Sequence, residues 1–261
     1  MKFNNLLLCM ICLIILSSCA TTDNKKKRNY SNRSEHDIQA LPGSPEMLNV
    51  ELGVGYLKRG HEGDIDIALQ KFKKAIGFNP KYALAHSLLA NAYDKKGLFN
   101  NAKTHYELSM KYNIGLPDII NNYANFLCQR GQYDLAVANY LKVVANPQYK
   151  TPAFAYENAG VCSYKSQNFI KAEEYFRKSL LLNKQLSNSL YYLMLIHLDN
   201  QQHMKARAFL QRLEELVQPS SEILVAGYKI EKALGNNTIA KTYLQKLQTL
   251  YPGSEALRRI N

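Results

Sequence analysis

The sequence lacks the pattern of a β protein. Polar and apolar residues do not alternate with a period of two over any extended part of its 261 residues. Half-buried strands need that alternation, because successive side chains of a strand point to opposite faces. We therefore expect no sheet, and an all-α fold.

The sequence also lacks the motifs of common enzyme and metal sites. It has six histidines but no His-Glu-x-x-His motif, and beyond the leader described below it has no Cys-x-x-Cys pair. Gly53-Val54-Gly55 is not a dinucleotide fingerprint, because no strand is expected before it. Gly63-Asp64-Ile65-Asp66 offers too few oxygen ligands for a calcium loop. We predict a protein that is not an enzyme, with no catalytic residues, metal site, cofactor or small-molecule substrate.

The apolar run near the N-terminus is too short for an ordinary membrane-spanning helix. Leu6–Leu16 contains eleven apolar residues, Lys2 precedes it, and Leu16-Ser17-Ser18-Cys19 follows. This arrangement suits a signal peptide, and its end resembles the lipobox of bacterial lipoproteins. We predict a signal peptide at residues 1–18 and lipidation of Cys19. The alternative is an ordinary signal peptide, or an uncleaved anchor with a chance cysteine.

The next segment, residues 19–45, is predicted to be a lipidated flexible tether. It has few apolar residues to offset the entropy of ordering, and it includes the basic run Lys25–Arg28. That run either touches anionic headgroups or is a solvated spacer. Because Ala20 rather than Asp follows Cys19, no inner-membrane retention signal is visible. We expect the outer membrane, on its periplasmic face, with the lipid as anchor.

The charge is basic, with 33 Lys and Arg against 21 Asp and Glu and a formal net charge of +12. Loss of residues 1–18 removes only Lys2 among the charges. A lipid surface or an acidic protein partner explains this sign as well as nucleic acid does. We predict no nucleic-acid partner.

An alanine recurs along the chain with spacings of 34, 34, 36, 34 and 34 residues, at Ala68, Ala102, Ala136, Ala172, Ala206 and Ala240. Four residues after each alanine stands a bulky side chain: Phe72, Tyr106, Tyr140, Phe176, Leu210 and Leu244. Glycines mark several turns, at Gly60, Gly97, Gly131 and Gly235. A period of 34 with small residues at the closest approach of two helices is typical of the tetratricopeptide repeat (TPR).

We predict a right-handed superhelical solenoid of six TPR helix pairs over residues 46–261, ending in a short capping helix at Ser254–Ile260. The first pair has three extra residues around His61–Ile67, in the turn between its helices. Gln167 stands where glycine is usual in the fourth repeat, and the fifth repeat also lacks that glycine. Atypical terminal repeats are expected, because one of their faces meets solvent.

Two cysteines remain after the leader and Cys19, namely Cys128 and Cys162. Each lies late in the first helix of its repeat, and their repeats are adjacent. First helices of neighbouring repeats pack side by side, so we predict a disulfide in an oxidising compartment. The alternative is two buried free thiols.

The inner wall of a TPR solenoid is formed by first helices, and asparagines recur there. Alignment of the repeats places Asn91 and Asn125 at one helix position, and Asn122 and Asn158 three residues earlier. An amide offers both a donor and an acceptor, so a row of asparagines can hold the backbone of an extended peptide. Tyr164 and Tyr191, with Leu195 and Leu198, are neighbouring candidates for partner binding. The alternative is that these are wet polar residues beside core aromatics.

Two segments resemble a known family. Asn121–Ala136 (NNYANFLCQRGQYDLA) and Ala155–Leu180 (AYENAGVCSYKSQNFIKAEEYFRKSL) are similar to the type IV pilus biogenesis and stability lipoproteins called PilF or PilW. The resemblance is sharpest in repeats three and four, and it implies six TPRs behind a lipobox. It also implies the role of a pilotin, an adaptor that binds the pilus secretin and promotes its outer-membrane localisation and multimerisation. The extra residues of repeat one and the missing glycines of repeats four and five depart from the pattern.

Two other functions stay open on the sequence. A TPR scaffold lipoprotein for another envelope machine, such as outer-membrane protein assembly or peptidoglycan enzymes, would show the same repeats. An enzyme is the third possibility, although no motif supports one.

Overall fold

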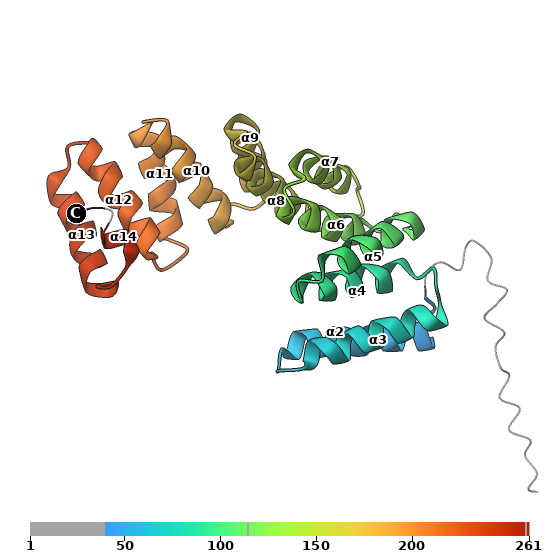
Figure 1. The fold of residues 1–261 in the computed structure, drawn as a ribbon. Coiled ribbons are helices and arrows are strands. Elements are labelled where there is room, and N and C mark those ends of the chain that lie inside the picture. The colour runs from blue at the N-terminus through green and yellow to red at the C-terminus, as the bar shows by residue number, and fades with distance from the viewer. Residues whose placement is uncertain (1–39, 114, 259, 261) are drawn as a thin grey trace, which may run out of the picture. The chain divides into compact units, whose positions relative to one another are not determined.

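The computed structural model describes residues 40–113, 115–258 and 260, and within them every regular element is a helix (Figure 1). The signal peptide, Cys19 and the tether as far as residue 39 lie outside the described residues. The helices are α2 (Pro45–Arg59), α3 (Asp64–Phe78), α4 (Ala83–Lys95), α5 (Phe99–Tyr112), α6 (Pro117–Gln129), α7 (Tyr133–Val144), α8 (Pro152–Lys165), α9 (Phe169–Leu182), α10 (Ser187–Asp199), α11 (His203–Glu214), α12 (Ser221–Ala233), α13 (Asn237–Leu250) and α14 (Glu255–Arg258).

The helices pack in pairs in the order of the chain, from α2 with α3 to α12 with α13. Each second helix also contacts the first helix of the next pair, as α7 contacts α8. The first helices contact one another from repeat to repeat and so form a continuous wall, while α14 packs against α12. The all-α solenoid of six TPR pairs with a short C-terminal helix is therefore confirmed.

The small residues of the repeat lie where the two helices of a pair approach most closely. A Cβ built on Gly160 of α8 would stand 2.7 Å from the ring of Phe176 on α9, so only glycine fits there. Ala172 of α9 and Phe176 are both fully buried. Gly227 takes the equivalent place in the sixth pair, against Tyr243. The alanine period thus marks the core of each pair.

The three extra residues of the first repeat are distributed rather than gathered in its turn. The second repeat provides the comparison. Relative to it, α2 extends one residue further beyond its small residue (Gly53, against Ala90 in α4), and the turn is one residue longer. The second helix, α3, begins one residue further ahead of its marker alanine than α5 does. Arg59 and Asp64 pair across this turn, with Arg59 Nε donating to Asp64 Oδ2 at 2.8 Å. The Arg59 guanidinium lowers the pKa of the Asp64 carboxyl to about 2.

In two turns between helices the backbone has the conformation usual for glycine, although the residue there is not glycine. Gly97 and Gly131 have φ of 76° and 75°, in the left-handed region. Gln167 and Gln201, at the same place in repeats four and five, have φ of 62° and 57°. A side chain in this region is strained. The repeat geometry imposes the turn even where the residue disfavours it.

Candidate partner-binding surface

The six residues predicted to bind a partner all lie on first helices, and therefore on one wall. Asn91 is on α4, Asn122 and Asn125 are on α6, Asn158 and Tyr164 are on α8, and Tyr191 is on α10. All six side chains are partly buried. Their environments differ, and the differences separate packing residues from residues available to a partner.

The side chains of Asn91 and Asn125 form hydrogen bonds with buried tyrosines of their own repeats. The hydroxyl of Tyr140, on α7, donates to Asn125 Oδ1 at 2.6 Å, and Tyr140 is 2% exposed. In the preceding repeat, burial raises the pKa of Tyr106 to about 12, and a side-chain hydrogen bond with Asn91 acts in the opposite direction. Each asparagine therefore partners a buried phenol. This differs from the expectation that both are available to a peptide backbone.

The sequence holds a signal for this role. Where the bulky residue of the second helix is Tyr106 or Tyr140, the residue fifteen positions earlier is Asn. In the fourth repeat the bulky residue is Phe176, which has no hydroxyl, and the residue fifteen positions earlier is Val161. Val161 packs against the cluster that contains Phe176. Asparagine appears where a buried hydroxyl needs a partner.

The asparagines at the other helix position, Asn122 and Asn158, form only a weak hydrogen bond or none to the described residues. Asn122 Nδ2 lies 3.5 Å from Ser87 Oγ on α4, a weak link between two first helices. The Asn158 side chain makes no hydrogen bond to any described residue. Its neighbour Glu157 is 6% exposed and accepts from Ser189 N at 3.1 Å and from Ser189 Oγ at 2.8 Å, which ties α8 to the start of α10. Asn158 is thus an available amide beside a rigid junction.

The two tyrosines also differ. The ring of Tyr164 lies 4.8 Å from that of Tyr192 and 5.2 Å from that of Phe169, so Tyr164 belongs to an aromatic cluster between repeats four and five. Burial raises its pKa. Tyr191 instead lines a groove over repeats five and six. Tyr164 supports the wall, and Tyr191 lines the groove.

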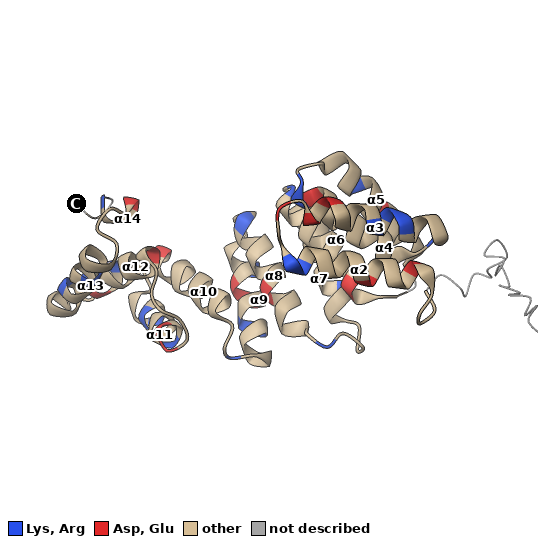
Figure 2. Ribbon diagram, turned by 90° about the horizontal axis from the view of Figure 1, so that it is seen from below, with Lys and Arg blue, Asp and Glu red and all other residues tan. Residues whose placement is uncertain are grey.

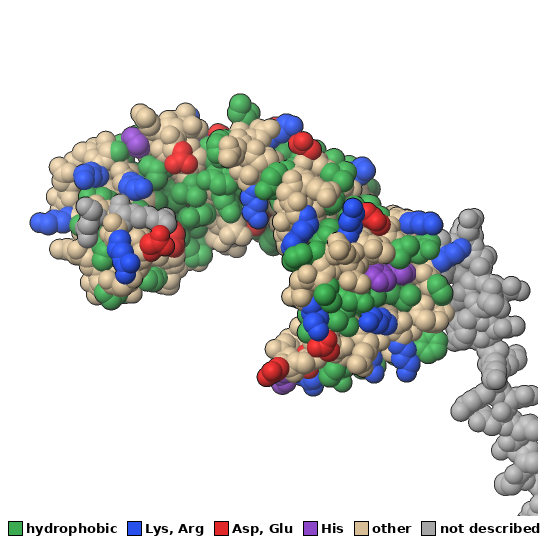
Figure 3. Space-filling model, in the orientation of Figure 1, with side chains coloured by type: hydrophobic (Ala, Val, Ile, Leu, Met, Phe, Trp, Pro, Cys, Tyr) green, Lys and Arg blue, Asp and Glu red, His purple; other side chains and the backbone are tan. Residues whose placement is uncertain are grey.

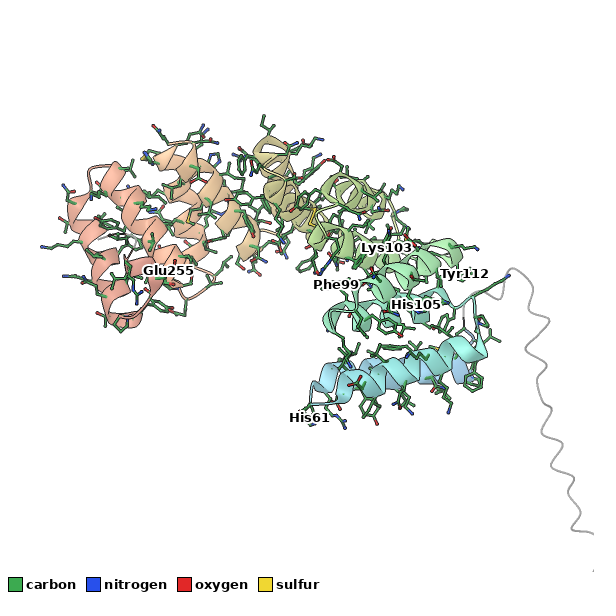
Figure 4. The ribbon with its side chains drawn as sticks, viewed as in Figure 1. His61, Phe99, Lys103, His105, Tyr112 and Glu255 are labelled. Carbon is green, nitrogen blue, oxygen red and sulfur yellow. A yellow bond between two sulfur atoms is a disulfide. The ribbon has the colours of Figure 1, made fainter. Side chains whose placement is uncertain are left out.

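This groove lies on the first-helix wall and measures about 250 Å³. From α10 it takes Tyr191, Leu195 and Leu198; α12 adds Val225, and α14 closes it with Ala256. Hydrophobic side chains gather over α10 in the space-filling view, and Glu255 of α14 lies beside them (Figures 3 and 4). Leu195 and Leu198 were predicted here. The parts played by α12 and α14 were missed, because the helical period does not show where a chain end will pack.

Two further apolar surfaces lie away from the wall residues. One is on the outer face of α2, where Leu48, Leu52 and Tyr56 follow at helical spacing and line a depression of about 520 Å³. No repeat precedes α2 among the described residues, so Leu48 and Leu52 remain 48% and 51% exposed. The other lies between α9 and α11 and is larger.

Cys128 and Cys162 are joined by a disulfide, with their Cα atoms 5.7 Å apart. The bond links α6 to α8, the neighbouring first helices of repeats three and four. Both cysteines are buried. The disulfide therefore cross-links the wall at its middle rather than exposing a reactive thiol.

Charges of both signs occur along the described helices (Figure 2). Many pair within a helix, as Arg177 does with Glu173 at 2.7 Å and Lys178 with Glu174 at 2.6 Å on α9. Over the described residues no three His, Cys, Asp or Glu side chains gather to hold a metal ion. None of the described helices combines the length and apolar character needed to cross a membrane. The basic run Lys25–Arg28 lies outside the described residues.

Helix pairs with this period, with small residues at their closest approach and a wall of first helices, define the chain as a TPR solenoid protein. Models of the tetratricopeptide repeat family match residues 83–113 and residues 229–254. The type IV pilus assembly protein PilF of Pseudomonas aeruginosa is 26% identical over 205 residues, which are 78% of this chain and 80% of PilF. An uncharacterised protein of Haemophilus influenzae is 30% identical over 118 residues, 45% of this chain and 64% of that protein.

Solved structures agree with this result. The crystal structure of PilW, described as a widely conserved type IV pilus biogenesis factor, superposes with a TM-score of 0.74 at 28% identity, covering 82% of this chain and 97% of PilW. The structure of Pseudomonas aeruginosa PilF has the same fold, with a TM-score of 0.75 at 24% identity over 83% of this chain and 96% of that one. This chain is homologous to PilF and PilW, and it is built of the same kind of TPR helix pairs.

Proposed function

We propose that the protein is a pilotin: an outer-membrane lipoprotein that binds the pilus secretin and promotes its localisation and multimerisation. The observation that supports this most is the extent of the homology. The similarity to PilF and PilW covers about four fifths of this chain, and so includes the first-helix wall as well as the repeat cores.

The proposal gives the N-terminal segment a mechanical role. Lipidation of Cys19 attaches more than one acyl chain, and two chains suffice for stable membrane attachment where one gives only marginal binding. The tether then holds the solenoid close to the membrane in which the secretin must assemble. The effective concentration of the binding wall near the partner rises accordingly.

Recognition is proposed to use the part of the wall that packing leaves available. Asn158 offers an amide without a described hydrogen-bond partner, and Asn122 holds only a weak link to Ser87. Further along the wall, the groove at Tyr191 offers apolar surface to a side chain. An extended secretin segment placed along these residues exchanges backbone hydrogen bonds with the amides and buries a side chain in the groove.

The test is a secretin multimer assay in a strain from which this gene is deleted. Wild-type protein should restore both the multimer and its presence in the outer-membrane fraction. Cys19→Ser should release the mature protein from that fraction, and normal fractionation of the variant would refute the anchor. A wall variant, Asn158→Ala with Tyr191→Ala, should remain folded and membrane-bound but weaken secretin binding in a pull-down.

The matched control is Asn101→Ala on α5, an exposed asparagine on a second helix. It should bind secretin like wild type. Full secretin assembly in the deletion strain, with loss of a different envelope complex, would assign the protein to another machine.

A further inference from the structure

The groove between α9 and α11 lies on second helices, away from the wall assigned to the secretin. It measures about 730 Å³ and opens between the C-terminal parts of the two helices, which flank α10 (Figure 1). Leu181, Phe209 and Leu216 line it with apolar surface, and Arg177, Lys184 and Arg212 surround them with positive charge. The groove therefore combines two chemistries in one place.

The apolar part of the groove is not explained by the packing of the solenoid. Leu181 is 81% exposed, the second-highest exposure among the large hydrophobic residues described. Nine residues after the marker alanine, the other repeats have Gly77, Lys111, Ala145, Glu215 and Thr249 at this position. None of these is a large apolar residue. Leu181 is thus specific to repeat four, and exposed apolar surface rimmed by polar groups marks interaction sites.

Two of the positively charged residues lie near the ring of Phe209, which also lines the groove. The guanidinium carbons of Arg177 and Arg212 lie 5.7 and 5.9 Å from the ring centroid of Phe209. Glu173 engages Arg177, but Arg212 and Lys184 form no ion pair with any described residue. Glu215 is the one carboxylate among the lining residues. The groove keeps a surplus of positive charge beside its leucines.

We infer that this groove binds an acidic peptide segment of a partner protein, with a bulky apolar side chain inserted against Leu181 and Phe209. Carboxylates of the segment pair with Lys184 and Arg212, and charge complementarity of this kind steers association and fixes orientation. A ligand must present apolar and anionic groups a few residues apart to meet both features. This inference goes beyond the proposed secretin role and does not depend on it.

The probe is a short fluorescent peptide in which glutamates alternate with leucine and phenylalanine, titrated against the mature chain carrying Cys19→Ser. Fluorescence anisotropy should show saturable binding that weakens as salt rises. Lys184→Glu and Leu181→Ser should each weaken it by about tenfold or more, as expected for residues central to an interface. Two matched peptides complete the design: one with lysine replacing glutamate and one with serine replacing the apolar residues. Neither should bind.

The controls make the same changes elsewhere: Lys241→Glu and Leu250→Ser, both exposed on α13, should leave binding unchanged. Because Leu181 and Lys184 are exposed, their variants should melt like wild type. Equal binding to all variants, or equal binding of the lysine peptide, overturns the inference. So does sedimentation showing a dimer that Leu181→Ser dissociates, because the groove would then receive a second copy of the chain.

Discussion

Replacement of Asn125 tests whether this asparagine serves the core or the partner. Tyr140 is 2% exposed, and its hydroxyl has Asn125 Oδ1 as its acceptor at 2.6 Å. Burial raises the pKa of Tyr140 above its ordinary value, which is the response of a phenol withdrawn from water. Asn125→Val removes the acceptor and keeps a side chain of similar width. The fourth repeat has Val161 at this position, but there it faces Phe176, which has no hydroxyl.

The magnitudes follow from which group is left without a partner. Asn125→Val leaves a buried hydroxyl unpaired, which costs about 1–3 kcal/mol. Tyr140→Phe leaves only the amide of a partly exposed residue, which water can reach, so it should cost about 1 kcal/mol or less. The double variant recreates the Val161–Phe176 arrangement and should be more stable than the sum of the single changes predicts. We expect a coupling free energy of about 1 kcal/mol.

The assay is urea unfolding of the four proteins, followed by circular dichroism at constant pH. Additive single changes, or an Asn125→Val variant as stable as wild type, would contradict the packing role and return Asn125 to the candidates for peptide binding. The Asn91–Tyr106 pair provides an independent repetition of the cycle in the preceding repeat.

Three other changes test separate features. Cys128→Ser opens the Cys128–Cys162 link, whose sequence separation is 34, and should cost about 3–4 kcal/mol in the chain-entropy account while helicity persists; an unchanged melting temperature would argue against the bond. Gln167→Gly removes the strain of a non-glycine residue in the left-handed backbone region, about 1–2 kcal/mol, but increases the conformational entropy of the unfolded chain, which costs about 0.5–1 kcal/mol. A net gain in stability of up to about 1 kcal/mol is therefore expected in the same unfolding assay. Burial and the neighbouring His86 lower the pKa of His105 to about 4 from 6.5. The unfolded chain then binds the extra proton first, so stability should fall as pH drops from 6.5 towards 4, and His105→Gln should flatten that fall, as unfolding at several pH values will show.

The repeat period predicted the fold well because it reports directly on packing. A residue at the closest approach of two helices must be small, and Ala68 through Ala240 are buried as this requires. The period could not predict where the extra residues of repeat one would go. Extra residues can lengthen either helix or the turn between them. In this structure they do all three, and a hydrogen bond from Arg59 to Asp64 spans the longer turn. The close packing of Gly227 was also missed, because Gly227 packs against Tyr243 and not against Leu244, the bulky residue that the repeat pattern marks.

The site was harder to predict than the fold because two demands select asparagine on the same helix face. One demand is a buried tyrosine that needs an acceptor, and it accounts for Asn91 and Asn125. The other is a partner backbone, and only an asparagine without such a tyrosine is available for it. Alignment of the first helices alone places both kinds in one row. Knowledge of the second-helix partner, Tyr or Phe fifteen residues later, separates them. On that basis we propose that recognition uses Asn158, with Tyr191 beyond it, rather than the pair whose amides already bond to the core.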